Sequence, residues 1–580
     1  MPSQFFGLNI AYTGLLASNA AMNTTSNNIA NVQTEGYSRQ QVTQQASNAL
    51  RVFQTYGCAG AGVETLAIER IRDEFYDGRF WDNNAQLGEY DMKQYYMQQL
   101  ETYFDDDGKS TGFKTIFDQL MITGMQALLK DPNSATAKSQ FVGYAGALTE
   151  YFNGMAGNLE KVQKDINQEI KLKVDQINSL AGEIASLNKQ INTIELAGTK
   201  ANELRDRRTL LIDELSKIVD VEVKETPIID ANNENRETGA NRYMVKIAGG
   251  QMLVDGSDYN GLECVARTSY EKVNQTDIDG LYEVYWAKFN LYNASMGGDL
   301  AGLIQMRDGN NGENFTGQVT ATGTTTTADG KTHDTVTVKV TKAYLQDLNK
   351  CNLSDQGGIL DLGNQEFWEY TCEYDANGNA TYSYTFTLSD SEKNPRGITN
   401  DRVGKKAEIG TDLSYQGIPY YMNQMNEWIR TFSQKFNDIL TSGYSGSGDP
   451  GVKMFTGNKA TSSEQFLLDD AAKRYDKQEK KNSKVTVKVN DDSYYRLTAK
   501  NFDILDAMEQ DPSLMANRKN ASDGVEQNDL LNDLKNLATD KSKMSFRGCN
   551  ASEFLQCILS DVALNASRAN TFYASFKDIS

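Results

Sequence analysis

The sequence predicts an α+β protein of several domains, in which an elongated rod of helices carries an inserted all-β body. Two patterns support this fold class. Apolar residues recur at steps of three and four over residues 159–194, which is the period of an amphipathic helix. Alternation of apolar and polar residues, typical of strands, is frequent between about 224 and 405, and helical patterns return after about 416. A long helical hairpin and the terminal helices would therefore form the rod.

The N-terminal segment, residues 1–35, predicts an axial heptad helix. Leu8, Leu15, Met22 and Ile29 lie seven residues apart, which defines the seam of a coiled coil. The first 34 residues carry no charged side chain, so ion pairs cannot stabilise this helix alone, and we expect it to need a partner helix. A secretory signal peptide is not predicted, because the segment has no basic region ahead of its apolar residues.

An extended connector is expected over residues 36–84, and the first part of the helical rod domain over 85–223. Residues 131–134, Asp-Pro-Asn-Ser, predict the end of one helix and the cap of the next. The stripe at 159–194 predicts a helix about 54 Å long. A second helix is expected at 202–218, and the turn around Gly198 makes the two an antiparallel hairpin.

The middle and the end of the chain complete the predicted organisation. We expect β-rich outer domains over 224–415, with strands at 243–247, 335–340 and 382–387. Residues 416–580 predict a return to the helical rod with a short β segment at 484–489. Helices at both ends of the chain and strands in the middle predict that the two ends fold together.

Charge and residue counts exclude several classes of function. The 58 Lys and Arg against 78 Asp and Glu give a net charge of −20, which repels nucleic acids and anionic membrane surfaces. No apolar stretch reaches about 18 residues, so membrane insertion is not predicted. The single histidine, His333, lies in a polar stretch that predicts an exposed loop or strand end. Without further histidines, the common catalytic triads and paired-His metal sites are hard to build.

We therefore predict no catalytic residue, no cofactor and no metal, although a pair of carboxylates acting on a glycoside would leave no linear signature. The six cysteines are dispersed, which argues against a zinc ribbon or a thioredoxin-like motif. Free thiols are expected, with Cys351 and Cys372 able to pair if strands bring them together.

Residues 26–39, SNNIANVQTEGYSR, resemble the N-terminal signature of bacterial flagellar axial proteins, the rod, hook and hook-associated proteins. Segments 60–63, 131–134, 184–191 and 202–216 narrow the resemblance to the FlgK family of hook-associated junction proteins. The resemblance implies an axial assembly motif. Its residues are Asn28, Ile29, Ala30, Asn31, Thr34, Gly36 and Tyr37.

This resemblance implies a structural, non-enzymatic component of the extracellular flagellum, an adaptor between hook and filament that is needed for motility. The flagellar type III system would export the chain without a Sec signal peptide. Its implied partners are further copies of itself in a ring, the hook protein, the second hook-filament junction protein and a flagellar export chaperone. The family varies at the surface, which accounts for an insertion at about 310–405. It also has a last heptad helix, and this sequence ends at Ser580 before one, so that helix is expected to be missing.

Two alternatives stay open at this point. A flagellar hook protein, or another axial protein, would share the N-terminal signature, although the helical hairpin argues against a hook protein. The inserted β region could instead make the chain a secreted adhesin or a carbohydrate-active protein.

Overall fold

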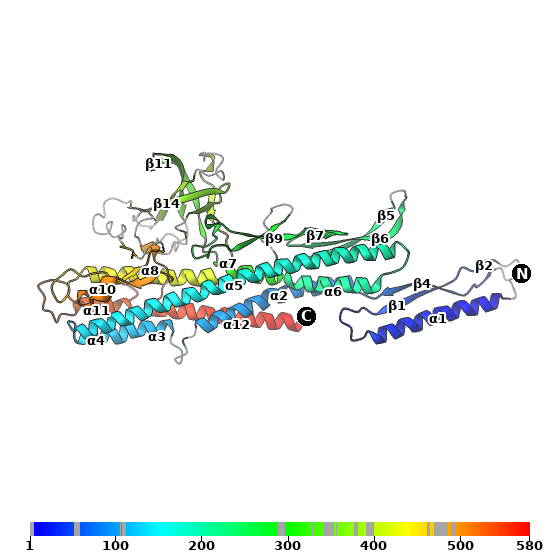
Figure 1. Cartoon of the computed structure of the whole chain (residues 1–580), viewed down its shortest axis with the longest axis horizontal. Coiled ribbons are helices and arrows are strands. Elements are labelled where there is room, and N and C mark those ends of the chain that lie inside the picture. Colours follow the sequence, from blue (N-terminus) through cyan, green and yellow to red (C-terminus); the bar gives the residue numbers. More distant parts are fainter. Residues whose placement is uncertain are drawn as a thin grey trace.

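A computed structural model describes residues 5–51, 58–104, 106, 112–230, 233–287, 296–327, 330–340, 353–354, 357–375, 381–389, 400–460, 464–468, 485–488 and 494–579. Figure 1 shows an elongated rod of helices, a β body on one side of it, and an arm of one helix and paired strands at one end. This arrangement confirms the predicted α+β fold class.

The long hairpin is the frame of the rod. Helix α5 (Ala135–Glu195) has 61 residues, and its apolar stripe is buried from Leu159 to Ile191. Ser134 caps it by accepting a hydrogen bond from the amide of Ala137, so the helix begins where the sequence predicts. Gly198, at a φ of +86°, turns the chain into α6 (Asn202–Ile218), which confirms the antiparallel pair.

Further helices pack around this hairpin. Helix α2 (Glu74–Tyr103) begins earlier than the helical region predicted from residue 85, and within the range expected to be an extended connector. The reason is local, because the Asp73 carboxylate caps the helix by accepting from the amide of Phe75. The next segments are α3 (Phe113–Asp118), a π-helical turn (Gln119–Gly124) and α4 (Met125–Lys130).

The second half of the chain returns to the rod. Its elements are α8 (Ile418–Thr441), β17 (Phe455–Gly457), β19 (Phe502–Ile504), α10 (Asp506–Gln510), α11 (Asp529–Leu537) and α12 (Ala551–Ile579). Helix α12 lies along α2, where the rings of Tyr90 and Phe572 are 5.0 Å apart and Asn83 Nδ2 donates to the Phe576 carbonyl. The C-terminal helix thus packs against α2 and not against the first helix.

Two small antiparallel sheets lie along α5 between the helical segments. The first has four strands, β5 (Val221–Asp230), β6 (Asn233–Ile247), β7 (Gln251–Asp255) and β8 (Asp258–Tyr259). The second pairs β9 (Leu262–Ala266) with β10 (Tyr282–Trp286). Asn178 ties this pair to α5, because its side-chain amide exchanges hydrogen bonds with the backbone of Leu262.

The β body is a closed antiparallel barrel that follows helix α7 (Gly298–Asp308). Its strands are β11 (Phe315–Thr326), β12 (Thr332–Val340), β13 (Gly358–Leu360), β14 (Gln365–Asp375), β15 (Thr381–Leu388) and β16 (Lys406–Ile409). The order β13-β16-β11-β12-β15-β14 closes because β13 also pairs with β14. The short strand predicted near 484–489 is β18 (Val485–Lys488), and it joins this sheet beside β14.

His333 lies at a strand end, one of its two predicted positions, but the prediction that it is exposed was wrong. It lies in β12 with 8% of its surface exposed, and its ring is 5.9 Å from that of Trp368. Neighbouring strands cover it, which the polar local sequence could not reveal. In the structure, Cys58, Cys264, Cys549 and Cys557 are in the reduced form. The possible pairing of Cys351 with Cys372 lies outside the described residues.

Candidate functional site

The N-terminal arm, residues 5–51 and 58–70, projects beyond the end of the rod (Figure 1). Helix α1 (Phe6–Ala30) packs on an antiparallel pair of strands, β1 (Gln40–Ala46) and β4 (Val63–Arg70). Two short strands, β2 (Leu50–Arg51) and β3 (Cys58–Ala59), pair at its far end. The face of α1 toward the strands is small and polar, with Ala17 and Thr24 buried. Gln44 Nε2 donates to the Ala17 carbonyl, 3.0 Å away.

The heptad seam of α1 faces away from these strands. The exposed fractions are 66% for Leu8, 59% for Leu15, 61% for Met22 and 69% for Ile29. Helices in globular proteins normally bury such a stripe and expose their polar face, whereas α1 does the reverse. Within the described part of the chain, the seam is therefore an apolar surface open to another molecule.

The recognised motif forms a corner between α1 and β1. The Asn28 carboxamide forms two hydrogen bonds with the Gln40 backbone, as a neighbouring strand would. Its Nδ2 donates to the Gln40 carbonyl at 2.8 Å, and its Oδ1 accepts from the Gln40 amide at 2.9 Å. The Tyr37 hydroxyl also donates to Asn28 Oδ1 at 2.9 Å, and it accepts from Asn27 Nδ2. These bonds fix the direction in which the chain leaves the helix.

Asn31, Thr34 and Gly36 complete the corner. Asn31 Nδ2 donates to the Asn27 carbonyl, and the Thr34 hydroxyl donates to Asn31 Oδ1. Gly36 has a φ of +75°, which favours glycine, and a Cβ there would lie 3.3 Å from Leu210 Cβ on α6. The motif thus serves an internal turn that is pressed against the rod.

One carboxylate holds the corner on the rod. Asp206, on α6, accepts from the amide of Ser38 at 3.0 Å and from Arg70 Nη1 at 3.1 Å. The ends of β1 and β4 are therefore tied to the same buried side chain. Asn202 adds a third bond from α6, because its Nδ2 donates to the Ile68 carbonyl. Burial, together with the negative charges of Asp206 and Glu203, raises the pKa of the Tyr37 hydroxyl.

The predicted site residues therefore fall into two groups. Asn28, Asn31, Thr34, Gly36 and Tyr37 lie together in the corner, whereas Ile29 and Ala30 face outward on the last turn of α1. A groove of about 810 Å³ runs beside the corner, lined by Ile29, Asn31 and Tyr37 among others.

The docking residues Asp206, Asn202 and Arg70 were not predicted as site residues. Asp206 and Asn202 lie in the recognised segment 202–216, but their spacing gave no sign that they contact residues more than 130 positions away.

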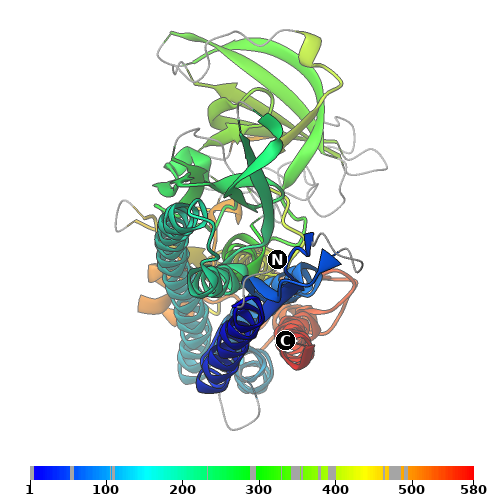
Figure 2. The ribbon, with the colours of Figure 1, turned by 90° about the vertical axis from the view of Figure 1, so that its right-hand side faces the viewer.

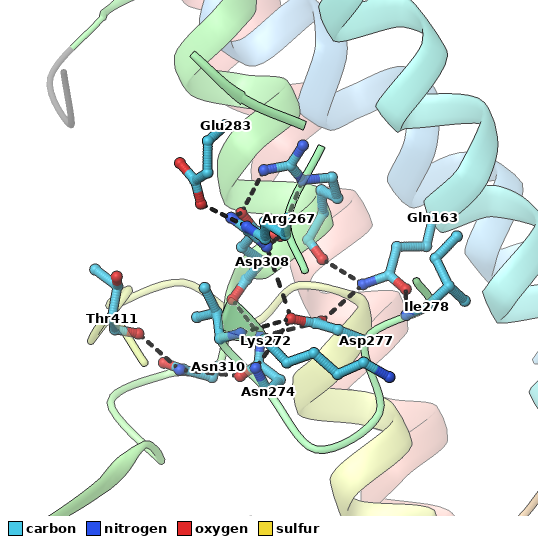
Figure 3. A network of polar contacts seen from close by, with 12 residues as sticks. Gln163, Arg267, Lys272, Asn274, Asp277, Ile278, Glu283, Asp308, Asn310 and Thr411 are labelled. Atoms are coloured by element: carbon cyan, nitrogen blue, oxygen red, sulfur yellow. Dashed lines mark hydrogen bonds and ion pairs between the residues drawn. The ribbon is translucent and has the colours of Figure 1, made fainter. Parts of the chain in front are cut away.

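A second polar cluster lies where the barrel joins the rod (Figure 3). Arg267 forms ion pairs with Asp308 and Glu283, and Asp277 accepts from Gln163 Nε2 of α5 at 3.0 Å. Asn310, in the segment that leads into the barrel, donates to the carbonyl of Thr411 in the segment that leaves it. The cluster therefore holds both connections of the barrel against α5.

The charges of this cluster are satisfied by one another. Burial alone would raise the pKa of Asp308, but the guanidinium groups of Arg267 and Arg307 hold it well below its usual range. Burial and the charge of Asp308 raise the pKa of Asp277. These side chains are buried and paired, so the geometry suits a structural mount for the barrel and not proton transfer to a substrate.

Neither metal binding nor membrane crossing has support in the described part of the chain. No group of three or more His, Cys, Asp or Glu side chains is arranged there to hold a metal ion. None of the helices there is both long and apolar enough to span a bilayer.

Comparison with known families identifies two regions. Residues 8–37 match the family described as flagella basal body rod protein, and residues 97–327 match the helical domain of the flagellar hook-associated protein FlgK. The chain is 36% identical over 231 residues to flagellar hook-associated protein 1 of Bacillus subtilis (strain 168), covering 38% of this chain and 45% of that protein. The protein of the same name from Escherichia coli (strain K12) is 30% identical over 262 residues, 44% of each chain.

These matches indicate the class first: parts of this chain are similar to axial proteins of the bacterial flagellum. Within that class, residues 97–327 are similar to the helical domain of the hook-associated protein FlgK. The chain spans a little under half the length of the curated relatives it matches. A solved structure, the flagellar hook junction protein FlgK from Burkholderia pseudomallei, aligns with 87% of this chain and 98% of its own, with a TM-score of 0.44 and 14% identity.

Proposed function

We propose that this protein is a structural subunit of the flagellar axis that joins the hook to the filament. It would form a ring with copies of itself and contact the hook protein on one side and the second hook-filament junction protein on the other. One observation carries the proposal: the first helix presents an uncharged, exposed heptad seam on an arm that projects beyond the rod. A surface of this kind suits burial in an assembly.

The chemistry of α1 suits a protein that is exported before it assembles. Outside the seam, most residues of α1 are Asn, Ser, Thr or Ala, so the isolated helix is marginal and its ordering is coupled to binding. Export through the flagellar type III system, with help from an export chaperone, and a final position outside the cell follow from this proposal. The names of the relatives support a structural role and favour a hook-associated protein over the hook-protein alternative.

The test is complementation of a strain that lacks the gene. Leu15→Glu places a charge in the centre of the seam, where it must be desolvated on assembly. We expect secretion of the variant but no filaments and no swimming. Leu172→Glu is the matched control, because Leu172 is 67% exposed on the rod helix α5 and lies outside the arm. It should restore swimming.

Two outcomes would contradict the proposal. One is normal swimming with Leu15→Glu, since the seam would then not be buried in the flagellum. The other comes from electron microscopy with gold-labelled antibody against residues 310–405. A single collar between hook and filament supports the junction position, whereas label along the whole hook would point to a hook protein.

A further inference from the structure

Two cysteines lie together where the last helix of the rod begins. The sulfur atoms of Cys549 and Cys557 are 3.7 Å apart, eight positions from each other in the sequence. Both side chains are half-buried, and Cys549 packs against the edge of the rod core. We propose that these two thiols form a disulfide in the folded, exported protein, and that this bond staples the first turns of α12 to the turn before it.

The backbone around both cysteines is already fixed. Cys549 closes a tight turn, in which its amide donates to the Phe546 carbonyl at 2.8 Å and its carbonyl accepts from the Phe546 amide at 2.9 Å. The two central residues of that turn, Arg547 and Gly548, have φ values of +48° and +87°. Such a turn holds Cys549 in one place relative to the helix.

The start of α12 is equally constrained. Asn550 caps it, since its Oδ1 accepts from the Glu553 amide at 2.8 Å and its own amide donates to Glu553 Oε2 at 3.0 Å. Phe554 and Ile558, on either side of Cys557, are buried in the rod core. A disulfide needs a sulfur separation of about 2.05 Å, so closure requires the two sulfur atoms, now 3.7 Å apart, to approach each other by about 1.7 Å.

The same turn anchors α12 to the rest of the rod. Arg547 Nη2 is 2.9 Å from Glu313 Oε1, in the segment between α7 and the barrel, and 3.4 Å from Glu427 Oε2 on α8. A bond between Cys549 and Cys557 would therefore connect α12 covalently to a turn that already contacts the barrel entry and the centre of the rod. The expected gain is resistance of this helix start to local unfolding.

The oxidation is a thiol-disulfide exchange with a low-molecular-weight disulfide outside the cell. Burial and the neighbouring Cys549 raise the pKa of the Cys557 thiol to about 11, which disfavours its thiolate, and we assign the first attack to Cys549. Its thiolate attacks the small disulfide and forms a mixed disulfide, and one small thiol leaves. Cys557 then loses its proton, attacks Cys549 Sγ and releases the second small thiol. Two protein thiols are oxidised and one small disulfide is reduced.

Glutathione supplies the probe. The full chain is equilibrated in buffers of reduced and oxidised glutathione, quenched with acid, alkylated and digested with trypsin. Residues 548–568 form one tryptic peptide with both cysteines. We expect this peptide to become two hydrogens lighter and to take no alkyl group, while exposed Cys58 gives only a mixed disulfide with glutathione. The folded chain should keep the bond at a glutathione ratio at least about tenfold more reducing than the denatured chain does, because folding holds the sulfurs together.

Two variants sharpen the test. Cys557→Ser should leave Cys549 as a mixed disulfide, and Cys264→Ser, which removes a distant half-buried thiol, should change nothing. Hydrogen exchange then measures how the disulfide affects the start of α12. Oxidation should slow exchange at residues 551–558 on the order of tenfold or more. Separate alkyl or glutathione groups on Cys549 and Cys557 of the folded, oxidised chain would overturn the proposal. So would equal exchange rates in the oxidised and reduced chains.

Discussion

The Asp206 carboxylate makes two of the hydrogen bonds that attach the N-terminal arm to the rod, so its removal should loosen the arm. In Asp206→Ala, the amide of Ser38 loses its acceptor and Arg70 loses its ion pair. Ser38 is buried, so water cannot easily replace the lost acceptor. The helix itself should survive, because alanine is the best helix former.

The loss of free energy that holds the arm on the rod follows from these two contacts. The hydrogen bond from the Ser38 amide ends on a charged group, and such a bond contributes about 1.5–3 kcal/mol, which is the larger part of the loss. The pair with Arg70 contributes about 0.5–1 kcal/mol, because the guanidinium is partly exposed and solvent screens it. The sum, about 2–4 kcal/mol, corresponds to a rise of roughly 30-fold to 1,000-fold in the opening of the arm from the rod.

Hydrogen exchange measured by mass spectrometry tests this directly. We expect faster exchange in residues 38–46 and 63–70 of Asp206→Ala, with unchanged exchange in the core of α5. Glu214→Ala is the control, because Glu214 is exposed on the same helix. Equal protection of the two strands in Asp206→Ala and in the native protein would refute the reasoning, since the carboxylate would then not hold the corner.

Three further predictions concern the rod and the barrel mount. Arg267→Met removes the cation that faces buried Asp277 and leaves Asp308 with one guanidinium partner, Arg307, in place of two, so urea unfolding should show a loss of about 3–5 kcal/mol in the free energy of unfolding. Folding lowers the pKa of Asp308, so this carboxylate stabilises the fold above its unfolded pKa of about 3.9, and that stabilisation is lost progressively as the pH falls from there toward the folded pKa. Urea titrations should therefore show that the free energy of unfolding falls less between pH 6 and pH 3 in Asp308→Asn than in the native protein. In Gly88→Ala the new methyl would lie 2.1 Å from the Lys217 carbonyl oxygen, so thermal unfolding should reveal a loss of about 1–3 kcal/mol. Gly78→Ala, on the same helix with open space around it, should be neutral or stabilising.

The helical frame could be predicted because its signals are local. The stripe at 159–194 and the cap at Ser134 specify α5 through the helix period and one hydrogen bond, neither of which depends on distant residues. Gly198 likewise predicts the turn of the hairpin from its own backbone preference. Two strands of the barrel, β12 and β15, were predicted in the same way from alternation along short runs.

Pairings between distant segments could not be predicted in this way. Strand β18 was expected as a strand, yet its place beside β14 depends on a contact across more than a hundred residues. His333 was expected to be exposed, because the polar residues around it gave no sign of the strands that cover it.

The sequence alone determined that the first helix carries an uncharged heptad seam and that residues 26–39 form a recognisable motif. The tertiary structure decided what each of them does. The seam is exposed because α1 packs its small polar face on β1 and β4, and the motif is an internal corner because Asn28 pairs with Gln40 and Asp206 holds Ser38. Hydrogen bonds between residues far apart in the chain form only once the fold brings them together, and one sequence carries no local record of them.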